Sequence, residues 1–267
     1  SIPDSQVEDW PRFTYRGMHV DTARNFIPKT TILKLLKVMS LYKLNKLHFH
    51  LSDDEGWRLE IPGLEELTKI GGRRCHDLEE RECVMSTLGS GADDQSSGSG
   101  FYTVKEVRCL LFCCCCDYLL DDPADTSYYF SVQYYTDNAV NPCIESTYRF
   151  ISEVYKQVSE IHRAIQPLKV YHFGGDEVAT GAWVNSTACA SLLRSGVSLK
   201  SVFTQRVATM TKNVSLAAWE DGLMDHDSTP WERSLLANKD VIVQSWQNVW
   251  EWGVASRAYN LANAGYK

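Results

Sequence analysis

Short apolar segments alternate with longer amphipathic ones along this chain, and the alternation limits the possible folds more than any other feature. Residues 46–51 alternate apolar and polar side chains like a half-buried strand, whereas residues 144–165 repeat apolar side chains at helical intervals. Strands that alternate with helices pair in parallel through helical crossovers. The sequence therefore predicts an α/β fold built on a parallel sheet.

The same criteria assign the remaining elements. The expected strands are residues 16–21, 46–51, 170–173, 216–219 and 241–246, and the expected helices are residues 29–42, 64–70, 144–165, 198–212 and about 249–262. Residues 1–15 contain two prolines and are expected to be an irregular lead-in from a preceding domain. Residues 16–267 are expected to form one domain, of a size that α/β barrels often reach.

Side chains suited to chemistry follow the predicted strands directly. They are Arg24, Asp53, the neighbouring pair Asp176 and Glu177, Trp219 and Trp246. The carboxyl ends of the strands form the active-site face of a (β/α)8 barrel, and an open doubly wound sheet would also gather them at one edge. Either arrangement predicts one site built from these residues.

Residues 171–177 are the most distinctive part of this set. A short apolar run ends at Gly174 and Gly175, which permit a sharp turn or a close backbone approach, and Asp176 and Glu177 follow at once. Two solvated acids at the end of a strand would be the purely structural explanation. The functional explanation is favoured because the loop that carries Asp53 leaves the same end of its own strand.

Charge and cysteine content narrow the classes of partner. The net charge of −7 argues against nucleic acid, which requires clustered Lys and Arg, and the apolar runs are too short to cross a membrane. The dispersed cysteines at 75, 83, 143 and 189 are typical of disulfide partners in an exported protein, whether secreted, lysosomal or periplasmic. Glycosylation sequons at Asn185 and Asn213 agree with export, although the N-terminal residues contain no export signal.

Acids, an arginine and two tryptophans around one site indicate sugar chemistry. A glycosidase usually places two carboxylates on opposite sides of the scissile bond, which the neighbouring Asp176 and Glu177 cannot easily do. This restriction points to the mechanism in which the substrate's own 2-acetamido oxygen attacks the anomeric carbon. Asp176 would orient the acetamido N–H and stabilise the oxazolinium-like intermediate, while Glu177 would serve as general acid and then as base. For this role the pKa of Glu177 has to be raised, by partial burial and by the neighbouring Asp176 charge.

Three stretches carry a resemblance to a known family. They are residues 16–24, residues 43–58, which read KLNKLHFHLSDDEGWR, and residues 172–177, which read HFGGDE. They resemble the β-N-acetylhexosaminidases of glycoside hydrolase family 20, and the resemblance covers most of residues 9–267. The loop at residues 89–100 and the segment around Cys75 and Cys83 are most similar to the chitobiase branch of that family.

The resemblance implies retaining hydrolysis of terminal β-linked N-acetylglucosamine or N-acetylgalactosamine, without metal or cofactor. It implies that Glu177 is the general acid/base and that Asp176 orients the acetamido group. Arg24 would hold the 3- and 4-hydroxyls of the sugar. Trp219 and Trp246 would wall the pocket around the acetamido methyl and the ring.

The resemblance also assigns a supporting residue and two disulfides. Asp53 would support the catalytic centre through a hydrogen-bond network. The implied disulfides are Cys75–Cys83 and Cys143–Cys189. The implied partner is an oligosaccharide or glycoconjugate that contains N-acetylhexosamine, and the sequence indicates no oligomeric state.

The sequence departs from the family between residues 104 and 118. The family has its third strand there, followed by a segment with an Asp and a His that should back Glu177, whereas this chain has an apolar run with cysteines at 109 and 113–116. Adjacent cysteines are a poor zinc site because neighbouring side chains diverge. We interpret the run as a splicing or gene-model error or a degenerate copy, with a locally repacked strand as the alternative.

The chain also ends before the family's last two strands. We therefore predict an incomplete (β/α)8 TIM-type barrel, with its third strand replaced and its last two strands missing, which leaves open sheet edges. Residues 1–267 expressed alone are expected to be unstable and inactive.

Three functions are compatible with these features. The first is an N-acetylhexosaminidase whose acid/base pair lies in this chain. The second is a catalytically inactive sugar-binding pseudoenzyme, or a mis-spliced fragment, that retains Arg24 and the tryptophans. The third is a metal-dependent hydrolase that uses His48, His50 and Asp53.

Overall fold

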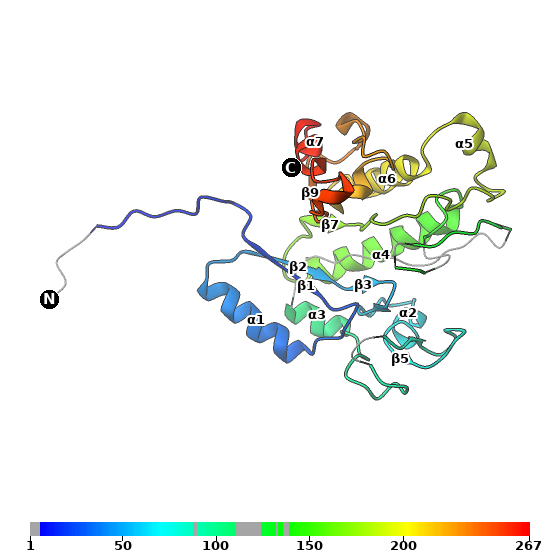
Figure 1. Ribbon diagram of the computed structural model, residues 1–267. Helices are drawn as coiled ribbons and strands as arrows, with labels where there is room; N and C mark the ends of the chain where they lie inside the picture. Colours follow the sequence, from blue (N-terminus) through cyan, green and yellow to red (C-terminus); the bar gives the residue numbers. More distant parts are fainter. Residues whose placement is uncertain (1–5, 88–89, 111–123, 132, 136–138) are drawn as a thin grey trace.

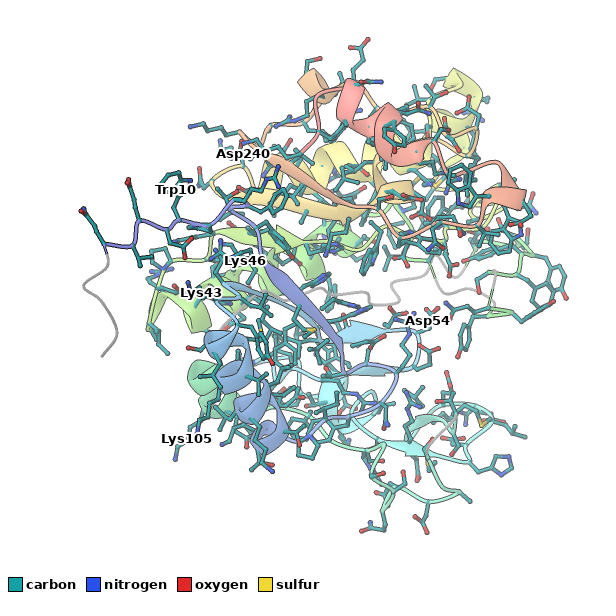
Figure 2. All side chains as sticks on the ribbon, turned by 60° about the vertical axis from the view of Figure 1, so that its left-hand side comes forward. Trp10, Lys43, Lys46, Asp54, Lys105 and Asp240 are labelled. Atoms are coloured by element: carbon teal, nitrogen blue, oxygen red, sulfur yellow. A yellow bond between two sulfur atoms is a disulfide. The ribbon has the colours of Figure 1, made fainter. Side chains whose placement is uncertain are left out.

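A computed structural model of the chain describes residues 6–87, 90–110, 124–131, 133–135 and 139–267. Figure 1 shows the parallel strands in two groups, with the N-terminal residues running away from the body. Residues 6–15 have no regular structure, as predicted, and Trp10 within them is exposed (Figure 2).

The first group of strands is a parallel pair with its crossover helix. Strand β1 (Gly17–Asp21) pairs with β2 (Lys46–His50), in a register that runs from Gly17 opposite Lys46 to Asp21 opposite His50. Helix α1 (Lys29–Leu41) connects them and buries Ile32 and Met39. Pro28 directly precedes the helix, where its missing N–H costs nothing. The predicted strand–helix–strand unit is therefore confirmed.

The chain after β2 forms a small hairpin instead of an irregular loop. Strands β3 (Ser52–Asp53) and β4 (Gly56–Trp57) pair antiparallel, and helix α2 (Glu66–Lys69) follows. Arg58 is completely buried beside the hairpin. Its guanidinium donates to the carbonyl oxygens of Thr22, Ala23, Gly72 and Gly100. A buried cation with this many acceptors fixes the loops after β1 and β2 relative to each other.

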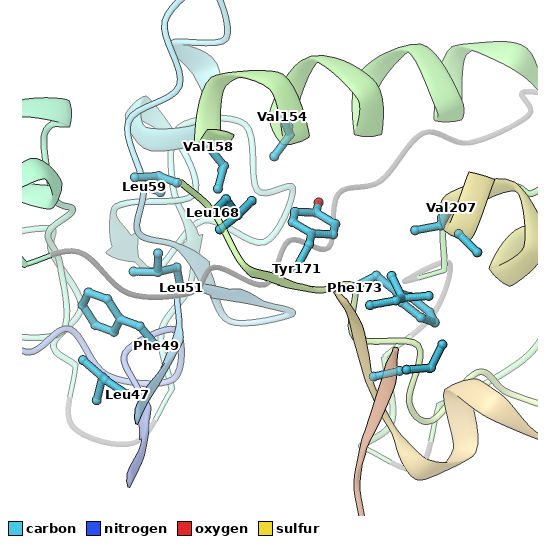
Figure 3. Close-up of a cluster of buried hydrophobic side chains, with 14 of the residues drawn as sticks. Leu47, Phe49, Leu51, Leu59, Val154, Val158, Leu168, Tyr171, Phe173 and Val207 are labelled. Atoms are coloured by element: carbon cyan, nitrogen blue, oxygen red, sulfur yellow. The ribbon is translucent and has the colours of Figure 1, made fainter. Parts of the chain in front are cut away.

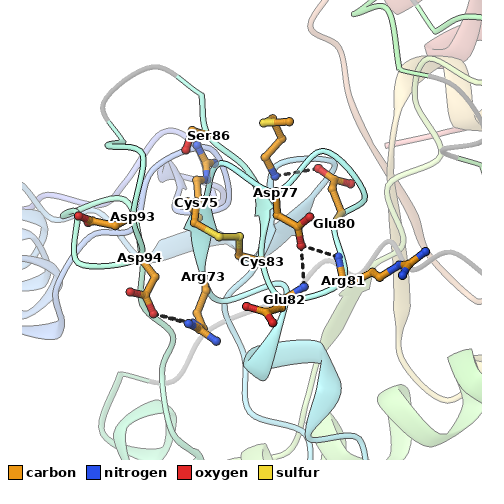
Figure 4. The surroundings of a disulfide bond; sticks show 12 residues. Arg73, Cys75, Asp77, Glu80, Arg81, Glu82, Cys83, Ser86, Asp93 and Asp94 are labelled. Atoms are coloured by element: carbon orange, nitrogen blue, oxygen red, sulfur yellow. Dashed lines mark hydrogen bonds and ion pairs between the residues drawn. A yellow bond between two sulfur atoms is a disulfide. The ribbon is translucent and has the colours of Figure 1, made fainter.

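A disulfide-linked excursion follows α2. Strands β5 (Arg74–Cys75) and β6 (Val84–Met85) pair in parallel, and a disulfide links Cys75 of β5 to Cys83, the residue directly before β6 (Figure 4). The Asp77 carboxylate accepts backbone N–H groups of the turn between them. This pairing confirms the first disulfide that the family resemblance implied.

The second group of strands is a three-stranded parallel sheet. Strands β7 (Val170–His172), β8 (Ser215–Trp219) and β9 (Val241–Gln244) pair in that order. Its helices are α4 (Glu145–Arg163), α5 (Ala190–Ser195) and α6 (Leu199–Met210), and short 3-10 turns follow β8 at η1 (Glu220–Leu223) and η2 (Arg233–Leu235). The strands and main helices predicted for this region are confirmed.

Two segments differ from the sequence-based expectation. The predicted helix at about 249–262 is a 3-10 turn, η3 (Trp250–Trp252), and a later helix, α7 (Arg257–Asn263), because Gly253 breaks the segment with a φ of 70°. Residues before the cysteine run form a helix, α3 (Val104–Leu110). The four cysteines at 113–116 lie outside the described residues, within which no strand joins β2 to β7.

One hydrophobic core nevertheless connects both groups of strands. Leu47 and Phe49 of β2 and the following Leu51 belong to this core and lie close together (Figure 3). Tyr171 packs toward α4, and Phe173 lies near Val207 of α6. Because strand side chains alternate, the residues between these positions face the opposite side of the sheets, where the polar site lies.

None of the helices that the structure describes combines the length and the apolar character needed to cross a bilayer.

Candidate active site

The turn after β7 creates the unusual backbone of the site. Gly174 and Gly175 have φ values of 76° and 86°, which other residues adopt only at a cost. A Cβ on Gly175 would lie 2.6 Å from the Phe173 ring and 3.0 Å from the Cα of Gly222. Glu177 also has a positive φ, 49°, so the general-acid candidate sits in a backbone conformation that its surroundings must hold.

The structure gathers the predicted residues around one opening. A cavity of about 210 Å³ is lined by His19, Arg24, His50, Gln133, Asp176, Glu177, Trp219 and Trp246. A smaller neighbouring cavity of about 80 Å³ shares Arg24, Asp176 and Glu177 and adds Asp53 and Asp54. Figure 2 shows Asp54 well away from Lys46, the residue at which β2 begins. All six residues selected from the sequence therefore meet at the carboxyl ends of the strands.

The two neighbouring acids are both difficult to ionise. Burial, followed by the charges of Asp53 and Asp221, raises the pKa of Asp176 to about 7. Burial also raises the pKa of Glu177, as does the Asp221 charge, while the hydrogen bond from Gln133 opposes the rise. The Gln133 Nε2 lies 3.0 Å from the Glu177 Oε2. The pKa of Glu177 is therefore raised, as predicted. The charge of Asp221 contributes more to this rise than the charge of the adjacent Asp176.

Arg24 is held by carboxylates from three positions of the N-terminal sheet region. Its Nη1 lies 2.9 Å from Asp21 Oδ2 and 2.7 Å from Asp53 Oδ2, and its Nε lies 2.7 Å from Glu55 Oε2. The Asp53 and Glu55 side chains are only 9% and 11% exposed, against 34% for Arg24. The guanidinium is therefore fixed in place with part of its surface open to the cavity.

Asp53 connects this arginine to a cluster of histidines. Its Oδ2 lies 2.7 Å from His50 Nε2, and His50 Nδ1 lies 3.2 Å from His19 Nε2. Burial lowers the pKa of His50, but the hydrogen bond and charge of Asp53 raise it overall. The ring of Trp219 lies against four histidines, with ring-centroid separations of 5.0 to 6.0 Å: His19, His48, His50 and His172. The floor of the site is consequently a packed aromatic layer.

The loop after Glu177 rests on a small separate core. This core contains Tyr129, Ala182, Trp183, Cys189 and Leu199 and is crosslinked by the disulfide Cys143–Cys189, the second pairing that the resemblance implied. Trp183 also lines the smaller cavity. The disulfide therefore supports the wall of the site next to Glu177.

Several contributors were not selected from the sequence. Gln133 and Asp221 contact Glu177, and Glu55 contacts Arg24. Arg74, which is completely buried, donates to the backbone carbonyls of Arg24 and Glu55. Asp221 and Glu55 follow predicted strands, so their positions in the sequence could have identified them as site residues. Nothing in the sequence indicates such a role for Gln133 or Arg74.

The metal-dependent alternative receives no support from the described residues. His50 contacts Asp53, but His48 packs against His172 with ring centroids 4.6 Å apart. Across residues 6–267, apart from the undescribed stretches, no group of three or more His, Cys, Asp or Glu is arranged to hold a metal ion.

Comparison with known proteins agrees with this geometry. The family model described as "Glycosyl hydrolase family 20, catalytic domain" matches residues 13–113 and 111–267. The chain is 37% identical to a beta-hexosaminidase from Vibrio vulnificus, over 100% of this chain and 37% of that protein. It is 33% identical to an N,N'-diacetylchitobiase from Vibrio harveyi, over 100% of this chain and 38% of that protein. The chain thus spans somewhat more than a third of the length of these relatives.

Solved structures give the same result. The exo beta-N-acetylglucosaminidase from Vibrio harveyi, solved with N-acetylglucosamine, superposes with a TM-score of 0.78 at 30% identity. The match covers 97% of this chain and 41% of that one. The described strands and helices are therefore part of a TIM-barrel-like catalytic domain.

Proposed function

The chain belongs to glycosyl hydrolase family 20, and we propose that the protein carrying it removes terminal, non-reducing β-linked N-acetylhexosamine from chito-oligosaccharides or glycoconjugates. The relatives named beta-hexosaminidase and N,N'-diacetylchitobiase support this activity. The observation that carries the proposal is the placement of neighbouring Asp176 and Glu177 in one cavity with Arg24 and two tryptophans.

Neighbouring acids favour a mechanism in which the substrate supplies the nucleophile. The acetamido oxygen would attack the anomeric carbon while Glu177 donates its proton to the leaving oxygen. Glu177 would then remove a proton from the water that opens the oxazolinium-like intermediate. The raised pKa of Glu177 supports the first step, because a general acid has to hold its proton near the working pH.

Asp176 would stabilise the positive charge that forms on the acetamido group. Burial and the charges of Asp53 and Asp221 raise its pKa to about 7. A bound acetamido N–H and the developing positive charge both favour the ionised carboxylate, so substrate lowers this pKa. A poorly solvated carboxylate next to a forming cation is an effective electrostatic stabiliser, because little solvent has to reorganise.

Recognition of the sugar would use the remaining residues of the cavity. The part of Arg24 that is open to the cavity would donate to ring hydroxyls. Trp219 and Trp246 would pack against the apolar ring face and the acetamido methyl. Asp53 would act indirectly, by fixing Arg24 and His50.

A non-catalytic, sugar-binding protein is the second candidate. The observation that favours it is the division of the family match at residues 111–113, where the family's third strand is expected. Arg24 and both tryptophans, which a sugar-binding protein would need, line one cavity. We propose that the third strand is replaced; sequencing the transcript across residues 103–121 tests this, and recovery of an Asp-Met-Pro-Gly-His-like segment would favour the enzyme.

Glu177→Gln in the full-length protein tests the catalytic proposal. We expect loss of at least roughly 100-fold in kcat on a chromogenic N-acetylglucosaminide, as for removal of a general acid, with binding of N-acetylglucosamine retained. Glu79→Gln, at an exposed acid outside the site, is the matched control. Unchanged turnover by Glu177→Gln would remove this residue from the mechanism. Equal turnover of a glucoside that lacks the acetamido group would remove the substrate-assisted step.

We also propose that the protein is exported. Two disulfides, Cys75–Cys83 and Cys143–Cys189, support this, because such bonds persist in oxidising compartments. Asn185 and Asn213 of the two sequons are exposed. Thiol labelling of the protein isolated from its natural source tests the proposal: labelling of these four cysteines without prior reduction would contradict it.

A further inference from the structure

Asp221 joins two parts of the site that come from different strands. It lies in η1, directly after β8. Its Oδ2 accepts the backbone N–H of Glu177 at 2.7 Å, and its Oδ1 accepts the indole N–H of Trp246 at 3.1 Å. One carboxylate therefore holds both the general-acid candidate and a wall of the sugar pocket.

The Glu177 backbone needs such support. A φ of 49° is uncommon for a residue with a side chain, and such conformations persist where surrounding contacts determine them. The surrounding contacts are close. The backbone N–H of Trp219 donates to the Gly174 carbonyl oxygen at 3.1 Å, and a Cβ on Gly222 would lie 3.0 Å from that same oxygen. The turn after β8 therefore packs directly against the turn that carries Glu177.

Asp221 also contributes charge to the site. Glu177 is faced by Asp221 and Asp53 as negative groups, by Arg24 as a positive group and by the neutral amide of Gln133. Asp176 is faced by Asp53, Asp221 and Glu177. On the other side, the Lys200 ammonium donates to the Asp221 backbone carbonyl at 2.8 Å.

We propose that Asp221 is a positioning residue for the reaction, which fixes the Glu177 peptide and the Trp246 indole relative to each other and places a negative charge beside the Glu177 carboxyl group. The inference rests on the proposed function. It goes beyond it by assigning a role to a residue that does not itself contact the substrate's reacting atoms.

Asp221→Asn in the full-length protein is the main test. Asparagine keeps the shape but offers one acceptor oxygen in place of two, and it removes the charge. We expect kcat to fall by roughly 10- to 100-fold, as for small displacements of catalytic groups, with a smaller change in KM. Because the Asp221 charge raises the pKa values of both Asp176 and Glu177, we expect the whole pH profile of kcat/KM to move to lower pH.

A direct titration separates this proposal from the proposed function. The Glu177 carboxyl carbon is followed by 13C NMR in glutamate-labelled protein and is assigned by its absence in Glu177→Gln. The midpoint is expected to fall in Asp221→Asn and to stay unchanged in Asp227→Asn, an equal charge change at an exposed site on the β8–β9 connection. If the wild-type protein cleaves no N-acetylhexosaminide, the proposed function fails while this titration still decides the role of Asp221.

Asp221→Glu provides a second variant in case the amide disturbs folding. It keeps the charge but moves the carboxylate, so kcat should fall while the Glu177 titration remains near that of wild type. A wild-type rate in Asp221→Asn would overturn the proposal. A lower rate in Asp221→Asn with an unchanged pH profile and an unchanged Glu177 midpoint would also overturn it, because that result would indicate a purely structural role for Asp221.

Discussion

The N-terminal and C-terminal groups of strands place charged residues in the same site in opposite ways. After β1 and β2, Arg24, Asp53 and Glu55 satisfy one another through ion pairs of 2.7 Å. After β7, Asp176 and Glu177 lie side by side, and burial together with nearby acids raises the pKa values of both. The ion pairs of the first region fix the geometry of its side chains. In the second region the ionised acids are destabilised, and this raises their proton affinity in a way that the reaction can use.

Removing Arg24 should lower the stability of the N-terminal region. Arg24→Met leaves Asp53 and Glu55, both almost buried, without their cation. We expect a loss of about 3 kcal/mol in the free energy of unfolding, at the lower end for a broken buried ion pair because Arg24 is partly exposed. Denaturant unfolding measures the change. Arg81→Met, which breaks a pair at the surface, should cost less than about 1 kcal/mol, and equal losses would show that the Arg24 network is not a stabilising unit.

Asp176→Asn should change stability in the opposite direction. The folded-state pKa of Asp176 is raised from 3.8 to about 7, so the ionised carboxylate costs stability as the pH rises from 3.8, and the cost is complete above 7. The upper bound is on the order of 4 kcal/mol, from 1.36 kcal/mol per pKa unit. The variant should therefore be more stable than wild type at pH 8, similar at pH 3.5, and inactive.

Thermal unfolding across this pH range checks the Asp176 prediction. Asp93→Asn, at an exposed loop acid, is the control and should follow wild type at every pH. A variant Asp176→Asn that is no more stable than wild type at pH 8 would remove the contrast between the two regions.

The two disulfides allow a second comparison between the regions. Cys143 and Cys189 are separated by 46 residues, and Cys75 and Cys83 by 8. Loop-closure entropy then predicts losses of about 4 and about 2.5 kcal/mol for the respective double Cys→Ser variants. Only the first pair belongs to the core that supports Trp183 beside Glu177, so only its removal should also lower kcat. If both double variants changed kcat equally, the core around Cys143–Cys189 would not support the site.

Sequence reasoning predicted the parts of this molecule that are local. The alternation of strand and helix patterns located the strands, and the position of Arg24, Asp53, Asp176 and both tryptophans after strands brought them to one face. It did not predict the charge partner of Glu177. The adjacent Asp176 was expected to be that partner, but a carboxylate from another strand, Asp221, contributes more.

Long-range contacts explain most of what was missed. Arg58 and Arg74 read as ordinary charged residues, yet both are completely buried and bind backbone carbonyls that lie far away in the sequence. Such a residue has no periodic or spacing signal, because its acceptors come from loops that fold together only in the tertiary structure. The break at Gly253 within a predicted helix had a local signal, the glycine itself.

Gln133 offers the smallest and most specific test of the comparison. Its amide donates to the Glu177 carboxylate, a contact that favours ionisation and opposes the effect of Asp221. Gln133→Ala should therefore raise the Glu177 pKa and move the alkaline limb of kcat/KM to higher pH, because the general acid keeps its proton longer. The shift is opposite in direction to that expected for Asp221→Asn. Gln95→Ala, a surface glutamine in the loop after Cys83, is the control; if Gln133→Ala and Asp221→Asn moved the limb in the same direction, the charge balance around Glu177 would not be what sets its proton affinity.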